Sequence, residues 1–140
     1  MAELSWQAAA DGRYWIDVAI GGRPVRVMID LGLVDPSGRV GFELEPAFYD
    51  DLKRSGLLSK FQFRFRRNAN GEITRSESGL AVAQLVNPNT MQVIGPALDL
   101  HVCRGAPGIP SRVGVVFFHR LTSSTVHWDL GTRSWCIHYP

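Results

Sequence analysis

Hydrophobic and polar residues alternate along much of this chain, a pattern typical of β-strands that bury one face. The clearest example lies in residues 14–29, where two alternating runs are joined by Gly21 and Gly22. A two-residue hairpin turn needs positive φ at both central positions, and glycine adopts such angles without strain. The pattern therefore predicts a β-hairpin whose second strand ends directly before Asp30.

Shorter alternating runs recur through the rest of the chain. They predict further strands at residues 42–44, 61–66, 80–86, 91–94, 98–103, 126–129 and 134–139. A helix is predicted from Pro46 to about Ser55, because proline is tolerated at the first helical position and Gly56 is a natural stop. A second short helix is expected at residues 117–121. Many short strands, one or two short helices and no visible domain boundary predict a single mainly β domain over residues 1–140, closed into a barrel or a sandwich.

One stretch between the predicted strands is polar and small, so it contributes little to a hydrophobic core. We predict that it forms an exposed hairpin tip or a mobile loop. The stretch consists of Thr74, Arg75, Ser76, Glu77, Ser78 and Gly79.

The composition fits a globular protein. The chain has 140 residues, of which 45% are hydrophobic and 20% are charged, so it is too apolar for a disordered protein. The formal net charge is only +2. Arginine and phenylalanine interleave in residues 63–67, a pattern that can contact nucleic acid, but a strand with one wet and one dry face is the favoured interpretation. No nucleic-acid partner is therefore expected.

The cysteines and histidines do not form a metal-binding pattern. Cys103 and Cys136 make no Cys-x-x-Cys motif, and two thiols are too few for a zinc site. We interpret them as free thiols in a reducing compartment. His127 and His138 could be neighbours across the last hairpin, but single histidines on strands are usually solvated or hydrogen-bonded. We expect no metal and no cofactor.

The sequence carries no visible targeting signal. Its first residues lack the basic and apolar regions of a secretory signal. No apolar run approaches the ~20 residues needed to span a bilayer. These features predict a cytoplasmic protein without a membrane partner.

The predicted hairpin ends in the sequence Val-Met-Ile-Asp-Leu-Gly at residues 27–32. This motif resembles the active-site opening of the retropepsin-type aspartic peptidases, in which an aspartate and a glycine follow a hydrophobic strand. Similar pieces follow in the family's order, namely the strand and helix of residues 42–56, the small stretch 74–79, the strand 98–103, the Val113-Gly114 step into a short helix, and the terminal hairpin. The resemblance covers nearly the whole chain and implies the closed, mainly β fold of that family.

The resemblance also implies a role for each part of the motif. Asp30 takes the place of the catalytic aspartate, and Leu31, Gly32 and Leu33 form the active-site loop. Residues 74–79 take the place of the flap that covers a peptide or protein substrate. Members of the family act as homodimers with one aspartate per subunit, and the paired carboxylates share a proton, activate water and protonate the leaving amide nitrogen.

Two positions depart from the family's pattern. The usual threonine or serine is replaced by Leu31, and the following small residue by Leu33. Leucine cannot make the hydroxyl hydrogen bond that braces the two loops across the family's dimer, and two bulky leucines crowd water and substrate. Two functions therefore remain. One is an aspartic endopeptidase acting as a homodimer, and the other is a catalytically weak or inactive homolog whose dimeric cleft serves as a peptide-binding or scaffold module.

A second Asp-Leu-Gly stands at residues 129–131. Only eleven residues follow Asp129, too few for the second lobe of a two-lobed peptidase. We therefore interpret this tripeptide as part of a hairpin turn.

Overall fold

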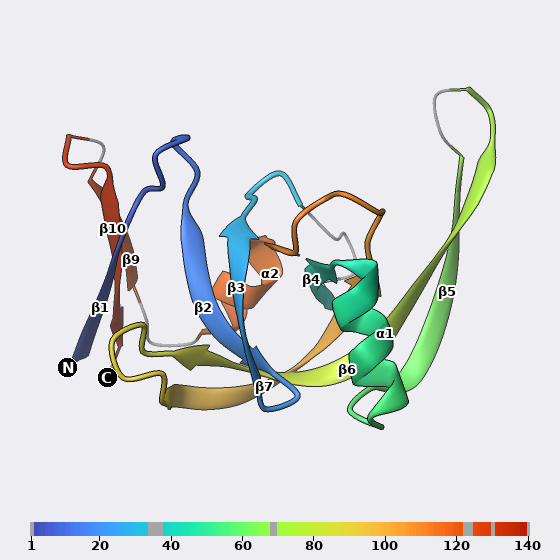
Figure 1. Cartoon of the computed structure of the whole chain (residues 1–140), viewed down its shortest axis with the longest axis horizontal. Coiled ribbons are helices and arrows are strands. Elements are labelled where there is room, and N and C mark those ends of the chain that lie inside the picture. Colours follow the sequence, from blue (N-terminus) through green and yellow to red (C-terminus); the bar gives the residue numbers. More distant parts are fainter. Residues whose placement is uncertain (1, 34–37, 68–69, 122–124, 130, 140) are drawn as a thin grey trace.

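The computed structural model describes residues 2–33, 38–67, 70–121, 125–129 and 131–139 (Figure 1). Within these ranges the chain forms short strands and two short helices. The strands are β1 (Ala2–Gln7), β2 (Trp15–Ile20), β3 (Arg23–Ile29), β4 (Val40–Leu44), β5 (Ser59–Arg67), β6 (Ile73–Val86), β7 (Val93–Arg104), β8 (Arg112–Val113), β9 (Thr125–Asp129) and β10 (Ser134–Tyr139). The helices are α1 (Pro46–Arg54) and α2 (Val115–Arg120).

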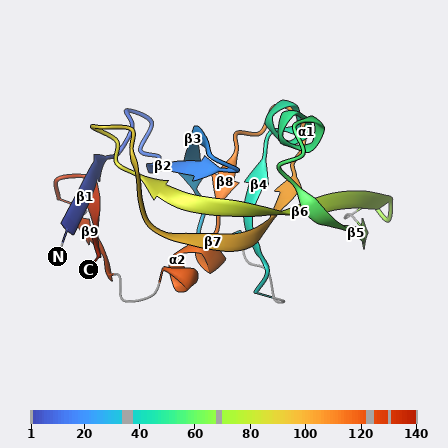
Figure 2. The same ribbon diagram turned by 90° about the horizontal axis from the view of Figure 1, so that it is seen from below.

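The strands form a closed ring with one small sheet beside it. β2, β3, β8, β4, β7 and β6 pair in that order, and β2 also pairs with β6, so the ring closes on itself. β5 pairs only with β6 among the described strands, and the two form a long hairpin that extends beyond the ring in both views (Figures 1 and 2). β1, β10 and β9 form the small sheet at the opposite end. The predicted mainly β, closed architecture with short helices is confirmed.

The predicted hairpin before Asp30 is confirmed as β2 and β3. Its turn residues Gly21 and Gly22 have φ angles of 61° and 80°, as a primed turn requires. Ile16 and Val27 are paired across the hairpin and fully buried in the core. β3 then pairs in parallel with β8, which fixes the place where the chain leaves the strand at Asp30.

Both helices lie close to their predicted positions. α1 begins at Pro46 and ends against Gly56, whose φ of 71° suits a glycine stop. Tyr49 and Leu52 are its fully buried residues and attach it to the core. α2 begins at Val115, two residues earlier than predicted, directly after Gly114. Within the described ranges no helix has the length and apolar character needed to cross a membrane.

The prediction that residues 74–79 form an exposed tip or loop is wrong, because they lie inside strand β6. Ser78 pairs with both β5 and β7 and is only 2% exposed. A Cβ on Gly79 would lie 3.0 Å from the Cβ of Leu58 and 3.2 Å from the Phe61 ring, so the small residues allow close packing. The turn of the β5–β6 hairpin lies instead between Arg67 and Ile73.

Strand β1 was not predicted from the sequence. It pairs with β10, and Trp6 stacks on Trp135 with ring centroids 4.4 Å apart. Trp128 of β9 stacks on the same ring at 5.2 Å. A short edge strand of this kind is stabilised by contacts with the far end of the chain, so its local pattern of Leu4 and Trp6 gave a weak signal.

Candidate active site

Asp30 sits where strand β3 ends, on a tight turn held by backbone hydrogen bonds. Its N–H donates to the carbonyl of Val113 at 3.0 Å, and its own carbonyl accepts from the N–H of Leu33 at 3.0 Å. The N–H of Gly32 donates to Asp30 Oδ1 at 3.0 Å. A Cβ on Gly32 would lie 3.2 Å from that same oxygen, so glycine allows the backbone to approach the carboxylate. Asp30 and Gly32 are therefore brought together as the motif predicts.

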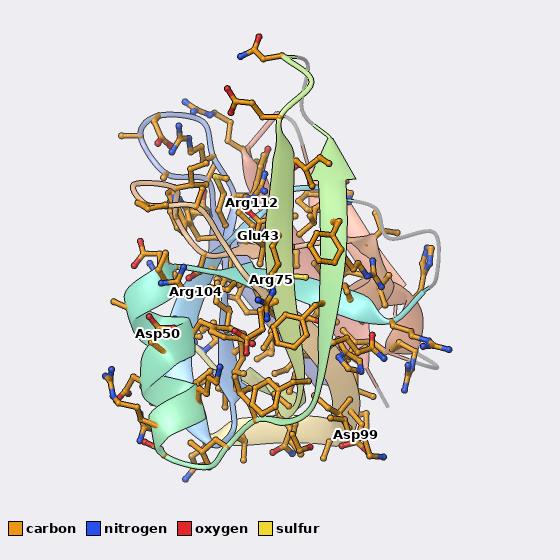
Figure 3. The ribbon with its side chains drawn as sticks, turned by 90° about the vertical axis from the view of Figure 1, so that its right-hand side faces the viewer. Glu43, Asp50, Arg75, Asp99, Arg104 and Arg112 are labelled. Carbon is orange, nitrogen blue, oxygen red and sulfur yellow. The ribbon has the colours of Figure 1, made fainter. Side chains whose placement is uncertain are left out.

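Sequence reasoning missed a cation that binds Asp30. Arg112, on strand β8, donates from Nη1 to Asp30 Oδ2 at 2.7 Å and from Nη2 to Glu43 Oε1 at 2.7 Å. Figure 3 labels Arg112 and Glu43, which come from the antiparallel pair β8 and β4. The guanidinium thus bridges two carboxylates. We call Asp30, Arg112 and Glu43 the carboxylate–arginine triad.

The triad is largely shielded from water. The side chains of Asp30, Arg112 and Glu43 are 29%, 23% and 19% exposed. Burial lowers the pKa of Arg112, but the hydrogen bonds and charges of Glu43 and Asp30 outweigh it, so this pKa is raised above its usual value. Arg112 Nε is buried and has no hydrogen-bond partner among the described residues. The triad carries two carboxylates and one permanent cation, so Asp30 is hydrogen-bonded to a positive charge of its own chain.

The two leucines of the loop lie in different surroundings. Leu31 is 53% exposed and lines a shallow pocket of about 180 Å³. Leu33 is half-buried and lies against the start of α2, since a Cβ on Gly114 would be 3.2 Å from the Cβ of Leu33. Leu31 thus presents an apolar surface, whereas Leu33 packs inward. The other residues of the shallow pocket are Val115, Phe118, His119 and Trp128.

A second hollow lies beside the triad, under the β5–β6 hairpin. It has a volume of about 400 Å³ and is lined by Phe63, Arg75, Glu77, Arg104 and Gly105. We call it the hairpin pocket. A Cβ on Gly105 would lie 3.2 Å from the Cγ of Glu43, so this wall of the pocket touches the triad.

The residues predicted as the flap therefore lie in different surroundings along strand β6. Arg75 and Glu77 contribute to the hairpin pocket, while Ser78 and Gly79 are buried near the base of the hairpin. Ser76 is half-buried. The side chain of Thr74 lies outside the described part of the structure. Alternation along β6 would have placed Arg75, Glu77 and Gly79 on one face and Ser76 and Ser78 on the other, had the stretch been interpreted as a strand.

No metal centre is visible in the described part of the chain. No three histidine, cysteine, aspartate or glutamate side chains there are grouped closely enough to hold an ion. The proposed neighbours His127 and His138 both lie near the terminal hairpin, where the side chain of His127 is outside the description.

No protein-family model matches the sequence, and no curated protein matches it. Solved structures do. A retropepsin-like aspartic protease from Rickettsia conorii aligns with a TM-score of 0.64 and 13% identity, covering 99% of this chain and 90% of that one. EIAV protease, in complex with the inhibitor HBY-793, aligns with a TM-score of 0.50 and 17% identity, covering 83% of this chain and 94% of that one. At such identities the likeness establishes the fold, and the predicted retropepsin-like fold is confirmed.

Proposed function

We propose that this chain is a retropepsin-like module that binds an extended peptide and does not efficiently hydrolyse it. The observation that carries the proposal is the 2.7 Å bond from Arg112 Nη1 to Asp30 Oδ2. An aspartic dyad works because two close carboxylates cannot both ionise and so share a proton. A guanidinium paired with each aspartate compensates the charge and removes the reason to share that proton.

The proposed binding unit is a homodimer, as in the family that the fold resembles. Leu31, beside Asp30, is 53% exposed, and Trp128 of the same shallow pocket is 39% exposed. Large apolar side chains grouped in this way are suited to a protein contact.

We assign the β5–β6 hairpin, including residues 74–79, as the cover of the peptide cleft.

The second candidate is an aspartic endopeptidase with one Asp30 from each subunit. The specific observation in its favour is the bond from the Gly32 N–H to Asp30 Oδ1 at 3.0 Å, which orients the carboxylate at the strand end. In this function, substrate or the partner subunit would have to displace Arg112 from Asp30 before a proton is shared.

The test that separates the two functions is incubation with a diverse peptide library from about pH 3 to pH 7, read by mass spectrometry. We expect the wild-type protein to bind peptides and to leave them uncut. Asp30→Asn should change the amount of bound peptide by no more than about twofold, because it preserves the shape of the side chain. Cleavage by the wild type that disappears in Asp30→Asn would establish the peptidase and overturn the binding-module proposal.

Leu31→Asp should weaken the proposed dimer at least about tenfold, because an unpaired charge would enter an apolar contact. Sedimentation velocity over a range of protein concentrations measures the dissociation constant. Met91→Asp is the matched control, since Met91 is also 53% exposed and its φ of 60° is one that aspartate tolerates. A wild type that stays monomeric, or equal effects of the two variants, would rule out this interface.

A further inference from the structure

The hairpin pocket holds one positive charge that has no acidic partner among the described residues. Arg104 donates to both oxygens of Asp50 at 3.0 Å, and the ammonium of Lys53 lies 2.6 Å from Glu77 Oε1. Figure 3 shows Arg104 beside Asp50 of α1 and Arg75 on the hairpin. Within the described ranges no carboxylate pairs with Arg75. Among the charged residues that line the pocket, Arg75 is therefore the one whose charge is not compensated by a described partner.

The position of Arg75 leaves its donors available. Its guanidinium carbon lies 3.8 Å from the centre of the Phe63 ring, so the flat face of the group rests on the aromatic ring. The N–H groups of a guanidinium point outward in its plane and match the two oxygens of a carboxylate. Stacking thus fixes the arginine and presents its edge to a ligand.

Exposed apolar side chains flank this cation. Arg75 is paired across the hairpin with Phe65, and Glu77 with Phe63, so these four side chains share one face of the β5–β6 hairpin. Phe65 is 72% exposed and Ile73, on the same face, is 63% exposed. Strand β5, which was predicted to have one solvent-exposed and one buried face, thus leaves Phe63 and Phe65 exposed to solvent. The face therefore combines Arg75 and Glu77 with exposed apolar side chains, and Glu77 is already bound by Lys53.

From these contacts we propose that the hairpin pocket is a subsite for an acidic side chain of the bound peptide, with apolar peptide residues lying along Phe63, Phe65 and Ile73. This inference rests on the proposed peptide-binding function and names the class of peptide. The pocket touches Glu43 through Gly105, so its occupant lies next to the triad. The acidic side chain would bind Arg75 rather than Arg112, because Arg112 already bridges two carboxylates.

The test uses fluorescein-labelled random octapeptide pools that differ at one fixed position, which is glutamate, glutamine or lysine, read by fluorescence polarisation. We expect the wild-type protein to bind the glutamate pool about tenfold more tightly than the glutamine pool. Arg75→Gln should remove this preference while leaving the affinity for the glutamine pool within about twofold. Arg75→Glu should reverse the preference in favour of lysine.

Arg13→Gln is the matched control, because it makes the same charge change on an exposed arginine between β1 and β2, outside the β5–β6 hairpin and the lining of the hairpin pocket. Binding without an acidic preference, or a preference that Arg75→Gln leaves intact or that Arg13→Gln removes equally, overturns this inference alone. If none of the pools binds the wild type, the peptide-binding function fails and the inference fails with it. Circular dichroism of each variant confirms that the fold is retained.

Discussion

Replacing Gly114 with alanine should lower the free energy of unfolding by about 3 kcal/mol, at the upper end of the cost of overpacking a core. A Cβ at this position would collide with the carbonyl oxygen of Leu33 and would also meet the Leu33 side chain. A backbone oxygen cannot turn aside as a side chain can. The backbone angles of Gly114, φ −105° and ψ −175°, suit alanine, so the cost is steric. Urea denaturation followed by circular dichroism measures the change.

Gly41→Ala is the matched control, because Gly41 accepts a hydrogen bond from Gly114 and lies in the same ring of strands. Its Cβ would lie 3.0 Å from Cδ1 of Leu100, the movable end of a side chain. We expect its free energy of unfolding to change by less than about 1 kcal/mol. Equal stabilities of the two variants would show that the loop of residues 30–33 does not press against the start of α2 as described.

The sequence could predict those parts of the fold that local residues decide. Gly21 and Gly22 set a turn through their own φ angles, and Pro46 and Gly56 bound a helix by their own geometry. Asp30 could be found because a strand pattern and a following glycine mark it within a few residues. Such signals need no knowledge of which distant segment packs alongside.

Residues 74–79 could not be placed correctly in this way. Small polar residues usually mark loops, and nothing local distinguishes a loop from a strand that must be small because it is crowded. Gly79 is small because Leu58 and Phe61 approach it closely, and Ser78 is covered by strands on both sides. Those neighbours become close only when β5 and β7 pair with β6.

The triad could not be predicted either, because its three residues become close only when strands that are distant in the sequence pair. Arg112 lies 82 positions from Asp30 and 69 from Glu43 in the sequence. It reaches both because the short strand β8 pairs in parallel with β3 and antiparallel with β4. A charged residue directly before the apolar Val113-Gly114 step was the one available hint. Because an arginine next to buried residues is rarely left unpaired, this position could have suggested that Arg112 binds a carboxylate.

Arg112→Met should lower the free energy of unfolding by about 2 kcal/mol near neutral pH. This is less than the 3–5 kcal/mol for breaking a fully buried pair, because the triad is about one quarter exposed. The variant keeps much of the side-chain volume but removes the cation that both Asp30 and Glu43 bind, so two partly buried carboxylates lose their counter-charge. Chemical denaturation near neutral pH, followed by circular dichroism, measures the loss.

Arg104→Met is the control for this prediction, since Arg104 also binds a carboxylate through two nitrogens but is 41% exposed, with its partner Asp50 39% exposed. A solvated pair of this kind contributes at most about 1 kcal/mol. Its removal should therefore cost clearly less than that of Arg112. If Arg112→Met costs no more than Arg104→Met, Arg112 does not hold the Asp30 carboxylate in solution. Asp30 would then be available to share a proton with its twin, and the endopeptidase would become the better explanation of this fold.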